Sequence, residues 1–450
     1  IVAGLCFAVA RTYKSSLAQG KELAAPVVFQ GGVAANAGMV RAFREVFCLG
    51  DGDLVVPRHH ACMGAIGALY HLLESGSGED GLGNREHGFP GTRLLEEHLE
   101  SGRRGACEHL EPLADPGPVA GKRVALTAGT PQSDVYLGLD VGSLSTNLVL
   151  IDRRGNVVAR RYLPTAGKPL EAIRGGLAEI REETGDRVRV RAAGATGSGR
   201  YLTGDFVGAD VITNEITAQA TAAVAIDPEV DTVFEIGGQD SKFISIDHGV
   251  VVDFEMNKVC AAGTGSFLEE QAEKLDIDIR DFGDIALAAA APSRLGDRCT
   301  VFMESDLNSH QQRGVPRENL VSGLAYSIVY NYIQKVVGTK RIGSRILFQG
   351  GVANNRSVVA AFRKVTGKPI VVPPHFDVTG AIGAAMLARD RVQADGGSGA
   401  AAAKPGESRS ETRFKGFDIS ERSYSVDRFT CGSCSNHCEI RRVRIEGERR

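Results

Sequence analysis

The chain has 450 residues, and its 52 Lys and Arg against 55 Asp and Glu leave a formal net charge of −3. This length allows two or three domains with cores of their own, and the near-neutral charge provides no basic surface of the kind that a nucleic-acid backbone requires. The longest apolar runs are shorter than the roughly 20 residues that span a bilayer. We therefore expect neither nucleic acid nor a membrane as a partner.

Residues 1–72 repeat a later part of the chain. The segment Phe29–Asn36 recurs as Phe348–Asn355 with seven of its eight residues identical, and the match covers residues 1 to about 72. A shared turn that arose by chance would not extend so far, so we predict that residues 1–72 are the C-terminal part of a first, truncated copy of a domain. Residues 73–133, rich in Gly, Glu, Arg and Pro, are predicted to be a linker.

The domain that follows begins with a strand, a turn and a strand. Val135–Asp140 and Leu148–Asp152 are apolar runs typical of buried strands. The turn between them contributes Gly142, Ser143, Ser145 and Thr146. Backbone amides and hydroxyls in such a turn suit a polyphosphate, and Asp140 at the strand end is suited to hold Mg²⁺ through water. A hairpin of this composition is at least as common without a ligand, so the motif needs support from the rest of the chain.

The same pattern returns about one hundred residues later. A second strand, turn and strand spans Asp231–Asp247, and its turn contains Gly237, Gly238, Gln239 and Asp240. A third element, a strand and turn at 346–354, contains Gly350, Gly351, Val352 and Asn354. Paired glycines allow the backbone to lie against a flat group such as adenine or ribose. Two phosphate turns followed by a nucleoside turn predict a nucleotide site.

Two cysteines precede predicted helices. Cys260 and Cys299 each stand just before a helical run. The free amides and partial positive charge of a helix N-terminus lower the pKa of a thiol and also stabilise an anionic iron–sulfur cluster. Two thiolates are half of the four that such a cluster needs, whereas two buried, inert thiols are the plain alternative.

The two hairpins and the later Gly-Gly turn resemble the phosphate-1, phosphate-2 and adenosine motifs of the superfamily of actin, sugar kinases and heat-shock chaperones, over residues 135–389. The resemblance implies an α/β fold of the actin-like ATPase type. In this fold two ribonuclease-H-like halves, with mixed five-stranded sheets flanked by helices, close on ATP and Mg²⁺. It assigns catalysis to Asp140, Glu215 and Asp240. Glu215, at the start of the connecting helix, would face the attacking water, unless it is an ordinary acidic residue favoured by the helix dipole.

The residues around the two cysteines narrow the resemblance. The segments at 257–265 and 299–305, Asn-Lys-Val-Cys-Ala-Ala-Gly-Thr-Gly and Cys-Thr-Val-Phe-Met-Glu-Ser, resemble the signature of the activator ATPases of 2-hydroxyacyl-CoA dehydratases and benzoyl-CoA reductases. This resemblance implies that residues 134–390 form a complete activator domain, and that Cys260 and Cys299 share one 4Fe–4S cluster with two Cys of a second copy. It further implies a ferredoxin- or flavodoxin-like electron donor and a dehydratase or reductase that accepts the electron.

Three features depart from single-domain activators. Asn147 stands where they often carry Lys, a partial copy comes first, and a flexible Gly- and Ala-rich linker at 391–412 leads to a Cys-rich region at 413–450. All three resemble large multidomain members with tandem activator domains, so the second copy is either a tandem domain or the other chain of a homodimer. Because of Asn147, we do not assume that the chain hydrolyses ATP rapidly.

The C-terminal region, which we interpret as the start of a truncated domain, contains Cys431, Cys434 and Cys438. This spacing, with His437 beside the last Cys, predicts a zinc or iron–sulfur site, against the alternative of a redox-active Cys pair. Nine Cys in 450 residues are too few for a disulfide scaffold, which indicates a reducing, cytoplasmic location.

The sequence therefore predicts an ATP-dependent electron activator with ATP, Mg²⁺ and a 4Fe–4S cluster as cofactors. Two other functions remain open at this point. A sugar or small-molecule kinase of the same superfamily would bind ATP but no iron, and a non-hydrolysing scaffold would hold the Cys-rich region without turnover.

Overall fold

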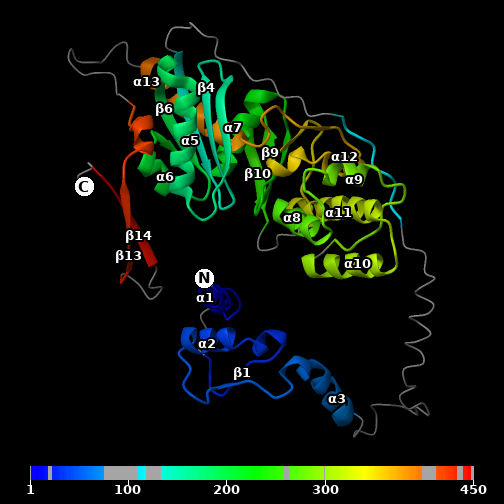
Figure 1. Cartoon of the computed structure of the whole chain (residues 1–450). Helices are drawn as coiled ribbons and strands as arrows, with labels where there is room; N and C mark the ends of the chain where they lie inside the picture. Colours follow the sequence, from blue (N-terminus) through cyan, green and yellow to red (C-terminus); the bar gives the residue numbers. More distant parts are fainter. Residues whose placement is uncertain are drawn as a thin grey trace. The chain divides into compact units, whose positions relative to one another are not determined.

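The computed structural model describes residues 2–18, 23–75, 109–117, 133–257, 263–297, 299–397, 412–432 and 439–446. The chain divides into two compact units, Ile1–Arg104 and Gly105–Arg450, whose helices and strands are labelled in Figure 1. None of the helices in the described ranges combines the length and the apolar character that crossing a membrane requires.

The first unit consists of helices around a two-stranded parallel sheet (Figure 1). Its elements are α1 (Val2–Thr12), η1 (Tyr13–Leu17), β1 (Val27–Val28), η2 (Gly32–Ala35), α2 (Ala37–Val46), β2 (Leu54–Val55), η3 (His60–Cys62) and α3 (Met63–Ser75). The small core that joins α1 to α2 consists of Cys6, Ala10, Met39 and Ala42. The side chains of Val2, Leu5 and Val9 on α1 are exposed.

The first unit reproduces the local geometry of residues 346–371. β1 and β2 pair in parallel, as β11 (Ile346–Gln349) and β12 (Ile370–Val371) do. The equivalent glycines Gly31 and Gly350 have φ of 97° and 89°. Asn36 and Asn355 then cap α2 and α12 (Arg356–Thr366), each accepting bonds from the amides two and three residues on. The repeated sequence thus folds in the same way locally in both units.

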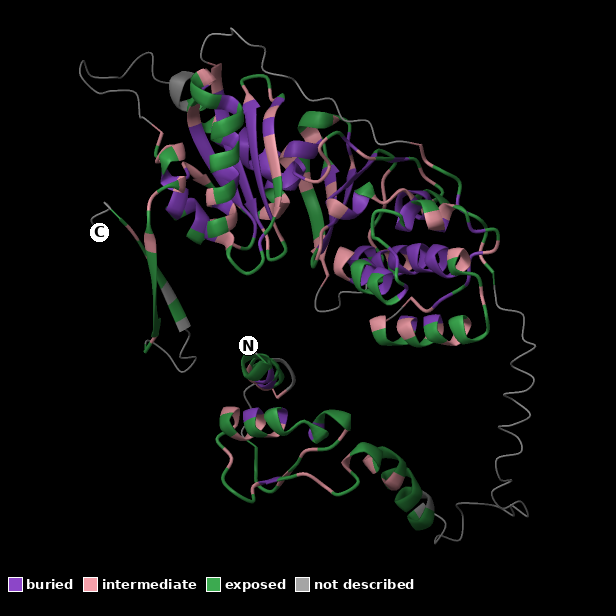
Figure 2. Ribbon diagram, in the orientation of Figure 1, coloured by how far each residue is buried: buried purple, intermediate pink, exposed green. Residues whose placement is uncertain are grey.

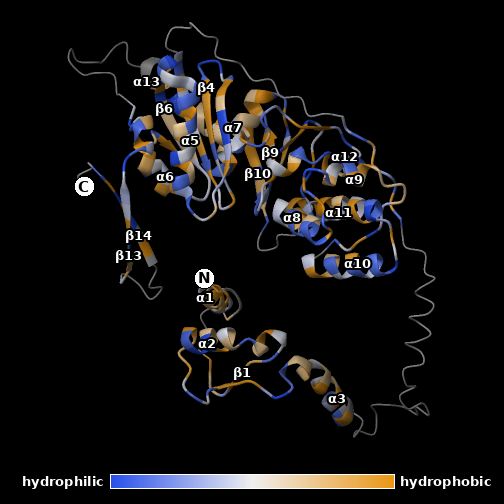
Figure 3. Cartoon of the chain, viewed as in Figure 1, coloured by the Kyte–Doolittle hydropathy of each residue, from blue (hydrophilic) through white to orange (hydrophobic). Residues whose placement is uncertain are grey.

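The first half of the second unit is a five-stranded sheet in the order β5-β4-β3-β6-β7. Its elements are β3 (Ser133–Val141), β4 (Ser145–Asp152), β5 (Val157–Pro164), α5 (Pro169–Thr184), η4 (Gly185–Arg187), β6 (Val188–Thr196), α6 (Arg200–Val207) and β7 (Val211–Ile212). β3, β4 and β5 are antiparallel, and β6 and β7 run parallel to β3. The inner strands are covered on both faces, so they are continuously apolar rather than alternating (Figure 3).

Helices enclose this sheet on both sides. α5 and α6 pack on one face, and α13 (Thr379–Gly397), backed by α7 (Glu215–Ile226), packs on the other. α13 lies so close to the strands that a Cβ at Gly138 would be 1.8 Å from the Ala381 carbonyl oxygen, and one at Gly194 would be 2.1 Å from that of Ala384. Glycine at these two strand positions therefore permits the close contact between helix and sheet.

The second half repeats this topology, with strand order β10-β9-β8-β11-β12. Its remaining elements are β8 (Thr232–Ile236), β9 (Ser241–Asp247), β10 (Val250–Met256), α8 (Gly265–Lys274), α9 (Phe282–Leu287), α10 (Thr300–Gln312), α11 (Arg317–Tyr332), η6 (Ile333–Val337) and η7 (Gly351–Asn354). The main core lies between the sheet and the helices α9, α11 and α12, and α11 is buried along almost its whole length (Figure 2). Two halves with mixed five-stranded sheets confirm the predicted fold class.

Segments before and after the two halves also belong to the second unit and pack against the halves. Residues 109–117, within the predicted linker, place Leu113 in the core of the second half and bond the Glu111 carbonyl to the Tyr326 hydroxyl at 2.8 Å. α13 continues to Gly397, and residues 412–420, including η8 (Phe417–Ser420), bury Ile419 in the core of the first half. A hairpin of β13 (Tyr424–Thr430) and β14 (Glu439–Ile445) follows.

Candidate functional site

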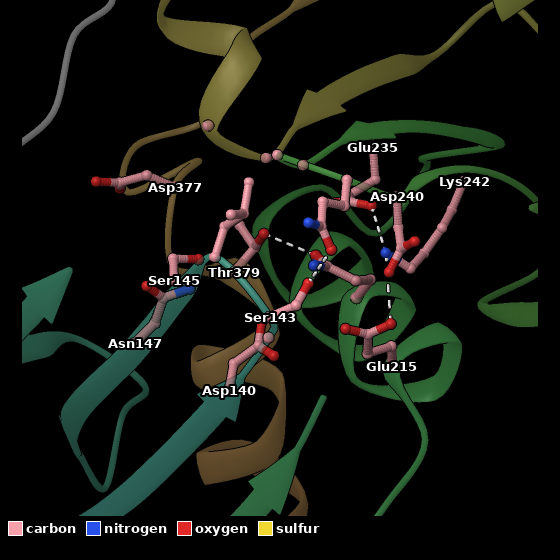
Figure 4. A pocket seen from close by; sticks show the side chains of 18 of the residues that line it. Asp140, Ser143, Ser145, Asn147, Glu215, Glu235, Asp240, Lys242, Asp377 and Thr379 are labelled. Carbon is pink, nitrogen blue, oxygen red and sulfur yellow. Dashed lines mark hydrogen bonds and ion pairs between the residues drawn. The ribbon is translucent and has the colours of Figure 1, made fainter. Parts of the chain in front are cut away.

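The two predicted phosphate turns face each other across one cavity (Figure 4). Each turn closes through the same backbone bond, from Gly142 N to Ser145 O at 2.9 Å in the first half and from Gly237 N to Asp240 O at 2.8 Å in the second. The cavity brings together these predicted residues: Asp140, Gly142, Ser143, Ser145, Glu215, Gly237, Gly238, Gln239, Asp240, Gly350 and Gly351. We call this space the phosphate cavity.

The two turns touch in this structure. The Ser143 hydroxyl donates to Gln239 Oε1, and the Leu144 side chain lies directly over Gly238. The phosphate cavity has a volume of only about 70 Å³. The two turns must therefore separate to admit a triphosphate.

Thr146 is the predicted phosphate ligand that the structure does not bring to the cavity. It lies on the opposite face of β4 from Ser145 and Asn147, because successive strand residues point to opposite sides. Its buried hydroxyl bonds to the Thr165 hydroxyl at 2.9 Å, and Thr165 bonds to the Gly142 carbonyl at 2.9 Å. Thr146 therefore supports the first turn from behind.

Asn147 lines the cavity and is only 5% exposed. Its Oδ1 has no hydrogen-bond partner within the described part of the chain. A buried amide oxygen without a partner is costly, so a ligand or water that donates to it would relieve the cost.

A buried ion pair that the sequence reasoning missed lies at the floor of the cavity. Lys242 Nζ is 2.8 Å from Glu235 and 3.4 Å from Glu215, and Figure 4 shows it reaching between the two carboxylates. Burial alone would lower the pKa of Lys242, but the charges of Glu235 and Glu215 outweigh it and raise the pKa above its ordinary value. The lysine therefore stays charged. The available signal was a Glu inside the otherwise apolar strand Thr232–Ile236.

Asp140 is buried at the end of β3, against the N-terminus of α13. A Cβ at Gly380 would be 2.2 Å from Asp140 Oδ2. Burial, and then the charge of Glu215, raise the pKa of Asp140 to about 7, against the opposing effect of Lys242. The Asp140 carboxyl therefore holds its proton to a much higher pH than an ordinary Asp, and a cation in the cavity would favour its ionised form.

A second cavity of about 410 Å³ adjoins the first. The nucleoside-turn residues Gly351, Val352 and Asn354 line it, together with residues of α8, α9 and the start of α12. Gly350 precedes them with φ of 89°, and a Cβ there would be 2.3 Å from the Ile236 carbonyl oxygen. Glycine is required at this position by the packing of the turn against β8, and contact of the glycine pair with a nucleoside stays a prediction. We call this space the nucleoside cavity.

The second phosphate turn is bonded to the start of α8. Gly265 N and Ser266 N donate to the carbonyls of Gly237 and Gly238 at 2.9 and 2.8 Å. Asn257 also holds the turn, because its Nδ2 donates to the Gln239 carbonyl at 3.1 Å. Residues 258–262, and with them Cys260, lie outside the described residues.

Cys299 is the N-cap residue of α10 and is partly exposed, as predicted from its place before a helical run. Side chains hold the segment before it. Asp306 on α10 accepts from Gly296 N at 2.9 Å, and the buried Asn331 on α11 donates to the Asp297 carbonyl at 2.8 Å. Cys299 therefore lies at a helix N-terminus, shortly after a segment held by side chains of α10 and α11.

The other predicted metal ligands are less completely described. Cys431 follows β13 and is partly exposed, whereas Cys434 and Cys438 lie outside the described residues. Across the described ranges, no three His, Cys, Asp or Glu side chains are gathered to hold a metal ion by themselves. Mg²⁺ at the phosphate cavity would take the rest of its ligands from phosphate oxygens and water, which is its usual mode of binding with nucleotides.

The sequence profile of the BadF/BadG/BcrA/BcrD ATPase family matches residues 137–388. The chain is 32% identical over 266 residues to the 2-hydroxyisocaproyl-CoA dehydratase activator of Clostridioides difficile, a match that covers 57% of this chain and 96% of the relative. It is 31% identical over 256 residues to the (R)-2-hydroxyglutaryl-CoA dehydratase activating ATPase of Acidaminococcus fermentans, covering 56% and 96%. The solved activator of the 2-hydroxyisocaproyl-CoA dehydratase from Clostridium difficile, with bound ADPNP, superposes with a TM-score of 0.53 at 28% identity and covers 60% of this chain and 100% of that chain.

Proposed function

The chain belongs to the BadF/BadG/BcrA/BcrD ATPase family, as its motifs predicted, and we propose that it hydrolyses ATP to pass a low-potential electron from a 4Fe–4S cluster to an acyl-CoA dehydratase or reductase. The relatives named as dehydratase activators support this class of partner. A ferredoxin- or flavodoxin-like protein is the proposed electron donor, by resemblance to the family.

The observation that carries the proposal is the facing pair of phosphate turns, joined to a nucleoside cavity. ATP would lie with its triphosphate between the turns and its base at Gly351, Val352 and Asn354. Asp140 and Asp240 are the carboxylates suited to Mg²⁺, which when bound neutralises the phosphates. Glu215, whose carboxylate is 3.4 Å from Lys242 Nζ, would orient the attacking water and take its proton.

Because the two turns are in contact, binding of ATP would change the positions of the two halves. A triphosphate must break the Ser143–Gln239 bond and move the two halves apart. α8 is bonded to the second turn, and its Lys274 forms an ion pair at 2.8 Å with Glu304 on α10, the helix that starts after Cys299. Opening and closing of the cleft is thereby linked to the cysteine segment through contacts between helices.

The number of cysteines and the setting of Cys299 support a shared cluster. Cys299 is the proposed first ligand, at the N-terminus of α10, and Cys260 is the proposed second ligand. Two thiolates per domain require a second domain for the other two. We propose that residues 1–72 belong to a tandem activator domain of this kind, since they repeat the sequence and local geometry of the complete one.

The iron content of the protein tests the electron-transfer part of this proposal. The protein is prepared without oxygen, with Cys431, Cys434 and Cys438 replaced by Ser so that they bind no iron. About two irons per chain are expected, since two chains would share one four-iron cluster. The Cys260→Ala, Cys299→Ala double variant should lose this iron.

The matched control is Cys48→Ala, Cys62→Ala, which removes two exposed thiols of the first unit and should keep the iron. Iron-free protein that still binds ATP would reject a cluster shared between two copies of this chain. Iron that is also absent from a protein with a complete first activator domain would reject the electron-transfer part and retain the ATPase. Iron that persists in the Cys260, Cys299 double variant would reject these two ligands.

A further inference from the structure

The phosphate and nucleoside cavities meet at four residues, which are Tyr162, Gly237, Gly238 and Gly351. A nucleotide with its triphosphate in one cavity and its base in the other must place its ribose and α-phosphate at this junction. Three of the four residues are glycines. Tyr162 therefore supplies the side chain that a bound nucleotide would meet there.

Tyr162 comes from the opposite half of the domain. It lies on β5 in the first half, whereas the other described residues that line the nucleoside cavity all belong to the second half. In the strand register Tyr162 stands opposite Asn147 on β4, which also faces the cleft. The tyrosine is thus the first half's contribution to the nucleoside cavity.

The Tyr162 side chain crosses the cleft. Its hydroxyl lies near the Ser145 side chain, and its oxygen is 3.2 Å from the position that a Cβ on Gly351 would occupy. At Gly32, the equivalent glycine of the first unit, a Cβ would meet no described atom within 4 Å. Because Gly351 has no side chain, the Tyr162 hydroxyl can come close to the backbone of the nucleoside turn.

The tyrosine is also available to a ligand. It is 50% exposed in the cleft. Burial of the hydroxyl raises the pKa of Tyr162 above its ordinary value, and the carboxylates Asp377, Glu269 and Asp140 act in the same direction. The hydroxyl consequently stays protonated at neutral pH and can donate a hydrogen bond to a phosphate oxygen.

We propose that Tyr162 is the residue through which the first half binds the nucleoside part of ATP, with its ring packed on the ribose and its hydroxyl donating to the α-phosphate. This inference rests on the proposed binding of ATP at this site. It goes further because the nucleoside, and not the triphosphate alone, would contact both halves of the domain. A triphosphate without a nucleoside would contact the turns and leave Tyr162 unused.

Equilibrium binding by calorimetry with Mg²⁺ tests this, using ATP, ADP and inorganic tripolyphosphate as probes. Tyr162→Ala should weaken ATP and ADP about tenfold or more and change tripolyphosphate binding less than twofold. Tyr162→Phe, which keeps the ring, should lose less affinity than Tyr162→Ala. Tyr201→Ala is the matched control, because Tyr201 is an exposed tyrosine of the first half that lines neither cavity, and it should bind all three probes normally.

Equal loss of ATP and tripolyphosphate in Tyr162→Ala would overturn the inference, because the tyrosine would then act only by supporting Ser145 in the first turn. Unchanged ATP affinity would overturn it as well. Failure of the unaltered chain to bind ATP would instead overturn the ATPase proposal, and this inference with it. A thermal unfolding scan shows whether each variant is folded before binding is compared.

Discussion

Lys242 is the single cation among the described residues that line the phosphate cavity. Asn147, which also lines the cavity, adds no charge. The carboxylates that line the cavity are Asp140, Glu215, Glu235, Asp240 and Asp377, of which Asp377 is paired with Arg160. The empty cavity is therefore negative, and a triphosphate of the same sign gains access only together with a divalent cation that offsets both charges.

The ionisation of Asp140 should make the unliganded protein less stable as pH rises. Its pKa is about 7 in the folded chain and near 4 when unfolded, so between these values the folded state holds a proton that the unfolded state has released. Stability is then fully present below about pH 4 and falls by up to about 1.4 kcal/mol per pH unit until pH 7. Asp140→Asn removes this dependence and should be the more stable protein at pH 8, by a few kcal/mol at most.

Urea unfolding of both proteins in EDTA at pH 5 and pH 8 measures this difference. Asp247→Asn, at an exposed aspartate that ends β9, is the control and should follow the parent at both pH values. If the Asp140→Asn protein loses as much stability as the parent between pH 5 and pH 8, the buried carboxyl does not govern this range.

The cavity residues that could be predicted from sequence are polar residues close to a glycine-containing turn. Asp140 and Asp240 are acids at strand ends next to glycines, and both line the cavity. Lys242 and Glu235 were missed because a strand pattern gives no means of deciding that two buried charges neutralise each other across neighbouring strands. Thr146 was predicted together with the turn residues but does not line the cavity, because the alternation of side chains along β4 turns it away from Ser145 and Asn147.

At the scale of elements, α11 connects the core of the second half to the segment before Cys299. The helix is buried along most of its length. In its last turn the Tyr332 hydroxyl donates a hydrogen bond to the Lys242 carbonyl of β9 at 2.7 Å. The neighbouring Asn331 amide donates to the Asp297 carbonyl at 2.8 Å. The strand that holds Lys242 and the loop that leads to Cys299 are therefore attached to neighbouring residues of one rigid helix.

Removing the Asn331 amide should loosen the Cys299 segment. In Asn331→Leu the Asp297 carbonyl loses its buried donor, which should lower the free energy of unfolding by about 1–3 kcal/mol. Cys299 should then react with iodoacetamide several times faster in iron-free protein, as measured on its peptide by mass spectrometry. Gln334→Ala, which removes only a partly exposed bond to the Asp297 side chain, should have a smaller effect.

Cys62 provides the internal reference for this measurement, because it is exposed in the first unit and should react at one rate in every variant. An unchanged rate at Cys299 in Asn331→Leu would mean that Asp306 alone holds the segment, through its bond to Gly296.

Most elements of the ATPase domain could be predicted because the local sequence pattern favours the same structure that the element adopts in the folded domain. The apolar runs around Gly142 and Gly237 became antiparallel strand pairs, and the Asn that follows each Gly-Gly-Val turn became a helix cap. Residues 109–117 could not be placed in this way. They contain few apolar side chains, and their position depends on the long-range contacts of Leu113 and Glu111 with the second half.

At the scale of the whole molecule, the second unit extends on both sides beyond the 137–388 range that matches the family. Residues 109–117 pack on the second half, and residues 412–424 pack on the first. In the latter segment Thr412 and Arg413 bond to Asp210 at 2.7 and 2.8 Å, and Tyr424 bonds to Glu171 at 2.6 Å. These segments are therefore parts of the folded domain and not merely connections to it.

If residues 412–424 belong to the fold of the first half, truncating their buried anchor should destabilise that half. Ile419 is 0% exposed among side chains of α5, α6 and the sheet, so Ile419→Ala should cost about 2–4 kcal/mol. The measurement is the hydrogen-exchange rate of backbone amides. The amides of β6 in the first half should exchange faster in this variant, whereas those of β8 in the second half should change less. Val426→Ala, at a 44% exposed position of β13, should leave both strands unaffected. Equal exchange in the two variants would mean that the segment merely rests on a half that is stable without it, and the family-matched range would then suffice as the folding unit.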